Sequence, residues 1–120
     1  MRLTVAERKV MEVVWAGEKM SAKQIAEELA ERVNWSKTTS YTMVSRCVEK
    51  GYLLRSEPNY TCEPAYTREQ VSHFETEELL ESNFHGSADL LVASLVEQKK
   101  LSLKEIEKLY QTLQEIEANA

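Results

Sequence analysis

The sequence predicts a mainly α-helical protein with a small β-hairpin, arranged as a winged helix-turn-helix over residues 1–66 followed by a helical region over residues 67–120. Helix N-cap signals recur along the chain, and two short β-prone runs surround a Pro-Asn turn directly after the third expected helix. The last part of the chain is acidic and amphipathic. Three short helices followed by a hairpin are the element order of a winged helix.

Most of the expected helices begin with a Ser or Thr placed three residues before a Glu or Gln, a pair that satisfies the free N–H groups of the first turn. The pairs are Thr4 with Glu7, Ser21 with Gln24, Thr67 with Gln70, and Ser102 with Glu105. Ser36 and Ser87 are N-cap candidates without such a partner. We therefore expect helices over residues 5–16, 22–33, 37–50, 68–83, 88–98 and 103–117.

The hairpin is predicted between the third and fourth helices. Gly51 is a helix stop, and the β-prone runs 52–56 and 60–63 surround the turn Glu57-Pro58-Asn59. Pro64 cannot donate a hydrogen bond to a neighbouring strand, so we expect it at an edge strand or at the end of a strand.

The C-terminal region, residues 67–120, has no core of its own but carries an apolar stripe at helical spacing. Seven positions are candidates for this interface: Leu91, Leu95, Ile106, Leu109, Tyr110, Leu113 and Ile116. Burial against the same helices of a second chain would make this a dimerisation region and the protein a homodimer. Packing back onto the chain's own N-terminal domain is the alternative.

Charge is divided unevenly along the chain, whose net charge is −5. Residues 1–66 carry 10 Lys and Arg against 9 Asp and Glu, whereas residues 67–120 carry 5 against 11. Within residues 32–55, five basic residues face only one acid, Glu49. This local positive stripe suits a nucleic-acid partner.

Several classes of protein and site are not expected. No run approaches the roughly 20 apolar residues of a membrane span, and the charged N-terminus does not resemble a signal peptide, so we expect a cytoplasmic protein without membrane insertion. Isolated His73 and His85 and the three glycines offer no catalytic or phosphate-loop pattern, so we expect no enzyme and no cofactor. Cys47 and Cys62 lack the spacing of a metal site and are expected to be half-buried; a thiol or copper response is the alternative.

The expected third helix has two chemically different faces. Met43, Val44, Cys47 and Val48 lie on one side, and the opposite side carries small hydroxyl groups with Arg and Tyr at its edges. Such a surface can enter a major groove and bind phosphates or base edges. The candidate DNA-binding residues are Lys37, Thr38, Thr39, Tyr41, Thr42, Ser45, Arg46 and Lys50, with Arg55 in the hairpin.

These residues also carry a resemblance to a known family. Ala6-Glu7, Val10-Met11 and Trp15 in the first helix, then Trp35-Ser36, Thr39, Thr42-Met43, Arg46 and Lys50-Gly51, resemble the penicillinase and methicillin-resistance repressors (BlaI/MecI) and the related copper repressor CopY. The resemblance continues to Gly86 and Leu101-Ser102. It implies a homodimeric repressor that binds a palindromic operator of double-stranded DNA through Thr39, Thr42, Arg46 and their neighbours, with Trp35 as a packing anchor.

The chain departs from the family in three places. Its basic residue after Ser36 is Lys37, one position from that of many relatives, so no operator sequence is carried over. The family's scissile Asn-Phe position aligns with Ser94-Leu95 rather than with Asn83-Phe84, which leaves open whether a membrane-bound sensor protease is a partner. The paired Cys motifs of the copper repressors are missing at this C-terminus. A winged helix that binds protein instead of DNA remains the competing interpretation.

Overall fold

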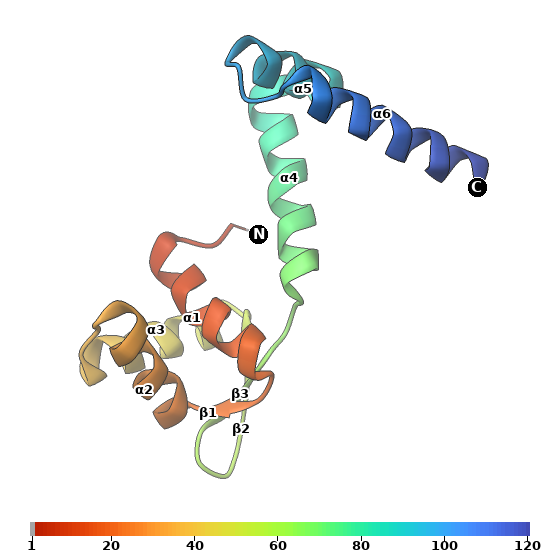
Figure 1. The fold of residues 1–120 in the computed structure, drawn as a ribbon. Helices are drawn as coiled ribbons and strands as arrows, with labels where there is room; N and C mark the ends of the chain where they lie inside the picture. The colour runs from red at the N-terminus through yellow and green to blue at the C-terminus, as the bar shows by residue number, and fades with distance from the viewer. Residues whose placement is uncertain (1) are drawn as a thin grey trace. The chain divides into compact units, whose positions relative to one another are not determined.

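The computed structural model describes residues 2–120 and divides into two compact units, one ending at Glu75 and the other running from Thr76 to Ala120. The first unit contains three helices and a sheet, followed by the first part of a fourth helix (Figure 1). Its elements are α1 (Val5–Gly17), β1 (Met20–Ser21), α2 (Ala22–Val33), α3 (Lys37–Glu49), β2 (Leu53–Ser56) and β3 (Thr61–Pro64). The remaining helices are α4 (Arg68–Phe84), α5 (Ala88–Glu97) and α6 (Leu103–Ala118).

All six predicted helices are confirmed to within one residue at each end. The predicted capping pairs explain this agreement, because reciprocal side-chain and backbone hydrogen bonds are present at Thr4, Ser21 and Ser102. Thr67 and Gln70 make the same pair of bonds before α4, at 2.9 and 3.0 Å. Local chemistry therefore fixes where these helices begin.

The sheet has three antiparallel strands in the order β1-β3-β2, so the prediction of a simple hairpin was incomplete. The missing strand, β1, pairs Met20 with Cys62 and Ser21 with Thr61. Two residues are too few for an alternating pattern to be visible in a sequence. Because β3 is the central strand, Pro64 is tolerated as its last residue, opposite Leu53, and not as part of an edge strand.

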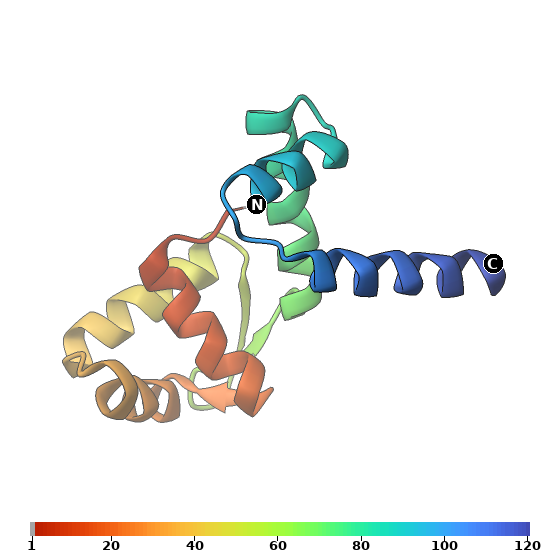
Figure 2. The ribbon, with the colours of Figure 1, turned by 45° about the horizontal axis from the view of Figure 1, so that its top comes forward.

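The core of the first unit lies where α1, α2, α3 and the sheet meet (Figure 1, Figure 2). Its fully buried side chains include Val10, Val14, Ile25, Leu29, Val44, Cys47, Leu53 and Cys62. Val71, from the first turn of α4, is buried in the same core. Ion pairs join Arg8 to Glu75 and Arg68 to Glu12. The beginning of α4 therefore packs as part of the winged helix.

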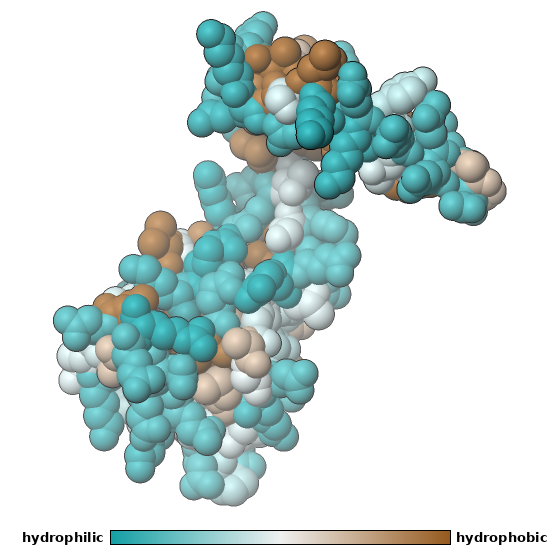
Figure 3. Space-filling model, in the orientation of Figure 1, coloured by the Kyte–Doolittle hydropathy of each residue, from teal (hydrophilic) through white to brown (hydrophobic). Residues whose placement is uncertain are grey.

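The second unit is exposed along both α5 and α6. No side chain of either helix is fully buried, and Leu90, Val92 and Val96 of α5 are 46%, 45% and 43% exposed. Figure 3 shows brown surface over the end of the chain that holds α5, and smaller brown patches on the first unit. Among residues 2–120, no helix is both long and apolar enough to cross a membrane.

Candidate nucleic-acid interface

Helix α3 is held by one buried face and by its N-terminal cap. Met43, Val44 and Cys47 are buried in the core, which confirms the predicted apolar face. Ser36 caps the helix by accepting a hydrogen bond from the backbone N–H of Thr39 at 3.2 Å. The opposite face of α3 is thereby presented to solvent in a defined orientation.

The exposed face of α3 carries hydroxyl groups that remain able to bind a ligand. Thr38, Thr39, Thr42 and Ser45 are all exposed. The Thr42 hydroxyl donates to the backbone carbonyl of Thr38 at 2.9 Å, which leaves its oxygen available as an acceptor. The Thr39 hydroxyl accepts from Ser36 at 3.0 Å and can still donate its own hydrogen. This face therefore offers both donors and acceptors to phosphates or base edges.

Three larger side chains border the hydroxyl groups. Arg46 is exposed, and its guanidinium has the planar shape that pairs with phosphate or guanine. Lys37, the first residue of α3, places its ammonium 5.9 Å from the centre of the Tyr41 ring. Tyr41 is half-buried against the core, so its ring supports Lys37 from the side of the helix. Trp35 is likewise half-buried, as expected for a packing anchor.

Lys50 has an internal partner that sequence reasoning missed. It directly follows α3, and its ammonium lies 2.6 Å from a carboxylate oxygen of Glu7, a residue with no exposed surface. Burial opposes ionisation of Glu7, but hydrogen bonds from Lys50 and Thr4 outweigh it and hold the pKa of Glu7 below its ordinary value. The same contact raises the pKa of Lys50. The charge of Lys50 thus neutralises a buried carboxylate, and Lys50 is no longer a free phosphate ligand.

Arg55 is also engaged within the first unit. Its guanidinium lies 3.6 Å from the centre of the Tyr60 ring and 2.9 Å from a carboxylate oxygen of Glu57. Glu57 in turn accepts a hydrogen bond from the backbone N–H of Tyr60, so the tip of the hairpin holds Arg55 in place. The one cation predicted for the hairpin is therefore ordered, and Glu57 offsets its charge.

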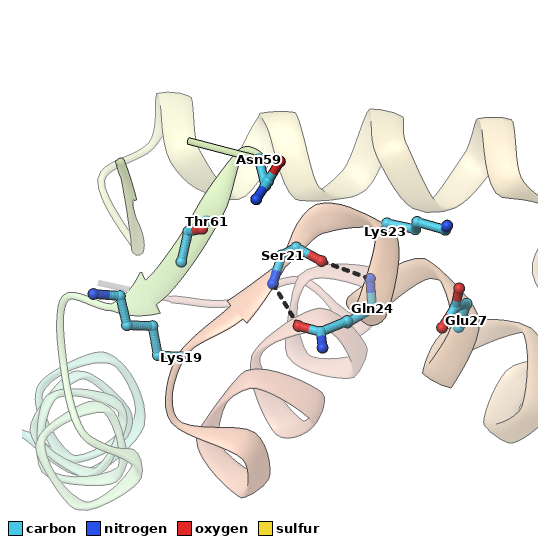
Figure 4. Close-up of a pocket in the computed structure, with 7 residues that line it drawn as sticks. All are labelled: Lys19, Ser21, Lys23, Gln24, Glu27, Asn59 and Thr61. Atoms are coloured by element: carbon cyan, nitrogen blue, oxygen red, sulfur yellow. Dashed lines mark hydrogen bonds between the residues drawn. The ribbon is translucent and has the colours of Figure 1, made fainter. Parts of the chain in front are cut away.

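Sequence reasoning also missed a basic surface beside α3. A groove at the start of α2 is lined by Lys19, Ser21, Lys23, Gln24, Glu27, Asn59 and Thr61 (Figure 4). A second groove joins Lys23 to Lys37 across Ala26, Glu27 and Ala30. Apart from Lys37, these residues lie in the link before β1, in β1, in α2 and in the hairpin, so a helical wheel of the third helix could not include them. The nearest sequence signal is the pair of lysines that flanks the Ser21 cap.

The two cysteines are more deeply buried than predicted. Each has 0% exposed surface, because Cys47 faces the core from α3 and Cys62 lies on the central strand β3. Burial raises the pKa of Cys47 to about 12, so its thiol is un-ionised at neutral pH. In the part of the chain that the structure describes, no group of His, Cys, Asp and Glu could hold a metal ion.

The candidate interface of the C-terminal unit is exposed in the single chain. Leu91 and Leu95 of α5 are half-buried, whereas the stripe on α6 faces solvent. Its residues are Ile106, Leu109, Tyr110, Leu113 and Ile116, from 37% to 62% exposed. A stripe this apolar favours a partner surface.

Comparison with known proteins identifies relatives over nearly the whole chain. The family model described as penicillinase repressor matches residues 3–115. The penicillinase repressor of Bacillus licheniformis is 27% identical over 116 residues, which cover 95% of this chain and 91% of that protein. The methicillin resistance regulatory protein MecI of Staphylococcus aureus (strain N315) is 28% identical over 109 residues, covering 89% of each chain.

Solved structures match more than half of the chain. The solution structure of the DNA-binding domain of the repressor BlaI is 26% identical, with a TM-score of 0.52, and the match covers 56% of this chain and 84% of that one. The Bacillus licheniformis BlaI monomer in complex with the blaP half-operator is 27% identical, with a TM-score of 0.50, over 57% of this chain and 85% of the other.

Proposed function

Because the chain belongs to the penicillinase repressor family, we propose that it represses transcription by binding operator DNA through α3. The observation that carries this proposal is the exposed face of α3, where hydroxyl groups and Arg46 stand opposite a completely buried anchor. A related repressor has been solved in complex with a half-operator, and the match covers 57% of this chain. The geometry therefore supports this surface, and the relatives support DNA as its partner.

We expect α3 to lie in the major groove with its N-terminal half toward the bases. The small hydroxyls of Thr38, Thr39 and Thr42 let the helix approach closely, while Lys37 reaches the phosphates at the groove edge. Arg46, one turn further along, suits a bidentate contact to guanine or a phosphate. Ser45 adds a hydroxyl beside it. Lys50 and Arg55 contribute less to DNA binding than the sequence suggested, because each is paired with a carboxylate, Lys50 with Glu7 and Arg55 with Glu57.

Homodimerisation through the C-terminal unit is the second part of the proposal. Two identical winged helices related by a two-fold axis read a palindrome, since each binds one half-site. The exposed stripe on α6, together with Leu91 and Leu95 on α5, is the surface that we assign to the partner chain. Linking two half-site contacts multiplies their affinities, which compensates for the modest positive charge of the DNA-binding unit.

The sensor protease suggested by the resemblance would act on this unit. Ser94-Leu95 lies inside α5, whereas Asn83-Phe84 lies at the end of α4, directly before His85 and Gly86 with positive φ angles. A protease requires an extended substrate, so the end of α4 is the easier bond to cleave. Cleavage at either bond would remove α6 and its stripe, and would thereby weaken the dimer.

The competing function is a winged helix that binds a protein. The test is to titrate the purified full chain with double-stranded DNA while salt is raised from about 50 to 200 mM. Binding to phosphates weakens steeply over this range because counterions are released, whereas a largely apolar protein contact changes little. No affinity for any duplex at the low salt concentration, with the chain folded, would refute the repressor proposal.

A further inference from the structure

The cations of the first unit fall into two groups. Most of those on α1, on β2 and after α3 are paired with carboxylates, namely Arg8, Lys50, Arg55 and Arg68. Within residues 2–120, by contrast, Lys19, Lys23 and Lys37 form no ion pair. Figure 4 shows Lys19 and Lys23 on either side of Ser21 at the start of α2. Of the other cations in the described part of this unit, Lys9 and Arg46 also form no ion pair, so unpaired positive charge lies at the start of α2 and at both ends of α3.

This charge is continuous with the face of α3. Lys23 lines two grooves, one shared with Lys37 of α3 and the other shared with Lys19 and Asn59. Ala26 and Ala30 line the first groove, so only small side chains separate the two lysines there. The basic surface thus runs from Lys37 through Lys23 to the tip of the hairpin.

We propose that this surface, formed by Lys19, Lys23 and Asn59, binds the sugar–phosphate backbone of the DNA strand that borders the groove occupied by α3. The inference rests on the proposed function and adds a second row of contacts outside the recognition helix. Its ligand is a phosphodiester, because lysine ammonium groups are unspecific point charges and the Asn59 amide can donate to the same oxygens. These residues fix the position of α3 and read no bases.

The side chains, not the amides of the helix end, provide these contacts. The backbone N–H of Ser21 donates to Gln24 at 2.9 Å, that of Gln24 donates to Ser21 at 3.1 Å, and that of Ala22 donates to the carbonyl of Tyr60 at 2.9 Å. The amides at the start of α2 are therefore largely occupied. The ammonium groups of Lys19 and Lys23 remain available.

Glu27 should affect DNA affinity in the direction opposite to that of the lysines. Its carboxylate lines both grooves and has no cationic partner within the described part of the chain. A phosphate bound there is repelled by this carboxylate, at an energy that distance and salt reduce. Removing the charge of Glu27 should therefore strengthen binding, although Glu27 itself makes no contact with DNA.

The experiment measures the dissociation constant of the full chain for two duplexes, one recovered by selection and one unrelated, over a series of salt concentrations. For Lys23→Gln we expect both affinities to fall by a similar factor, about threefold to tenfold at low salt, and the slope of log K against log salt to decrease by about 0.9. Lys19→Gln should act in the same direction. Glu27→Gln should tighten binding to both duplexes by about twofold to fivefold at low salt.

Lys108→Gln is the matched control, because it removes one positive charge on α6, which belongs to the other unit and does not line either groove. Lys23→Arg should retain the slope of the wild-type chain. An unchanged slope in Lys23→Gln, or a loss confined to the selected duplex, would overturn the phosphate assignment. If the wild-type chain recovers no duplex in the selection and does not bind the unrelated duplex at low salt, the proposed function is overturned instead, so the two failures are distinguishable.

Discussion

Replacing Leu109 and Leu113 by Asp should convert the protein to a monomer. Both side chains lie on the stripe of α6 and are 55% and 52% exposed in the single chain. Burying a Leu completely contributes about 1.5–3 kcal/mol, so covering the exposed half contributes roughly 1 kcal/mol at each position. A homodimer contains two copies of each residue, which makes the loss about 4 kcal/mol before the cost of burying carboxylates is added.

A loss of about 4 kcal/mol corresponds to a dissociation constant for the dimer that is roughly a thousandfold higher. Sedimentation equilibrium over a range of protein concentrations measures this constant directly. The control is Lys108→Gln with Gln111→Asp, which changes the net charge by the same amount on the opposite side of α6. A double Leu variant that remains as dimeric as the wild-type chain would show that the stripe is not the interface.

Four further predictions concern the first unit. Arg46→Ala should weaken binding to a selected duplex by about 1–3 kcal/mol without changing the unfolding midpoint, and unchanged affinity would remove Arg46 from the interface. Val71→Ala should destabilise the winged helix by about 1–3 kcal/mol, because it leaves a cavity in the core; urea unfolding followed by tryptophan fluorescence measures this. No loss would mean that α4 does not contribute to that core. Since the pKa of Glu7 lies below its ordinary value of 4.5, ionised Glu7 stabilises the fold above that pH, and this stabilisation is lost as the pH falls through the lower folded-state pKa. In Glu7→Gln, the free energy of unfolding should therefore fall less as the pH is lowered than in the wild-type chain. Urea unfolding across the acid range measures the difference. Cys47 should react with a thiol reagent at about pH 8 only after unfolding, and rapid reaction in the native chain would contradict its burial.

The sequence alone predicts the fold well because the deciding interactions are local. Each expected helix begins at a cap whose partner lies three residues away, and the apolar face of α3 follows a simple helical period. The strand β1 is the exception. Its two residues are defined only by pairing with Cys62 and Thr61, about forty residues further along the chain.

The site is less predictable because charge pairing is a tertiary property. Lys50 has the position of a phosphate ligand at the end of α3, yet its ammonium binds Glu7, which the first helix brings into contact with it. Conversely, Lys23 belongs to a different helix from Lys37 and shares a groove with it only in the folded chain. Composition and periodicity describe one element at a time and therefore identify neither relationship.

The most direct test of the account is to select bound duplexes from a random pool with the purified full chain, at two salt concentrations. If α3 reads bases as part of a homodimer, the recovered sequences should share a palindrome with half-sites about one helical turn apart, more sharply enriched at the higher salt concentration, where nonspecific binding is reduced. Recovery of no common sequence by a folded, dimeric protein would contradict the central claim.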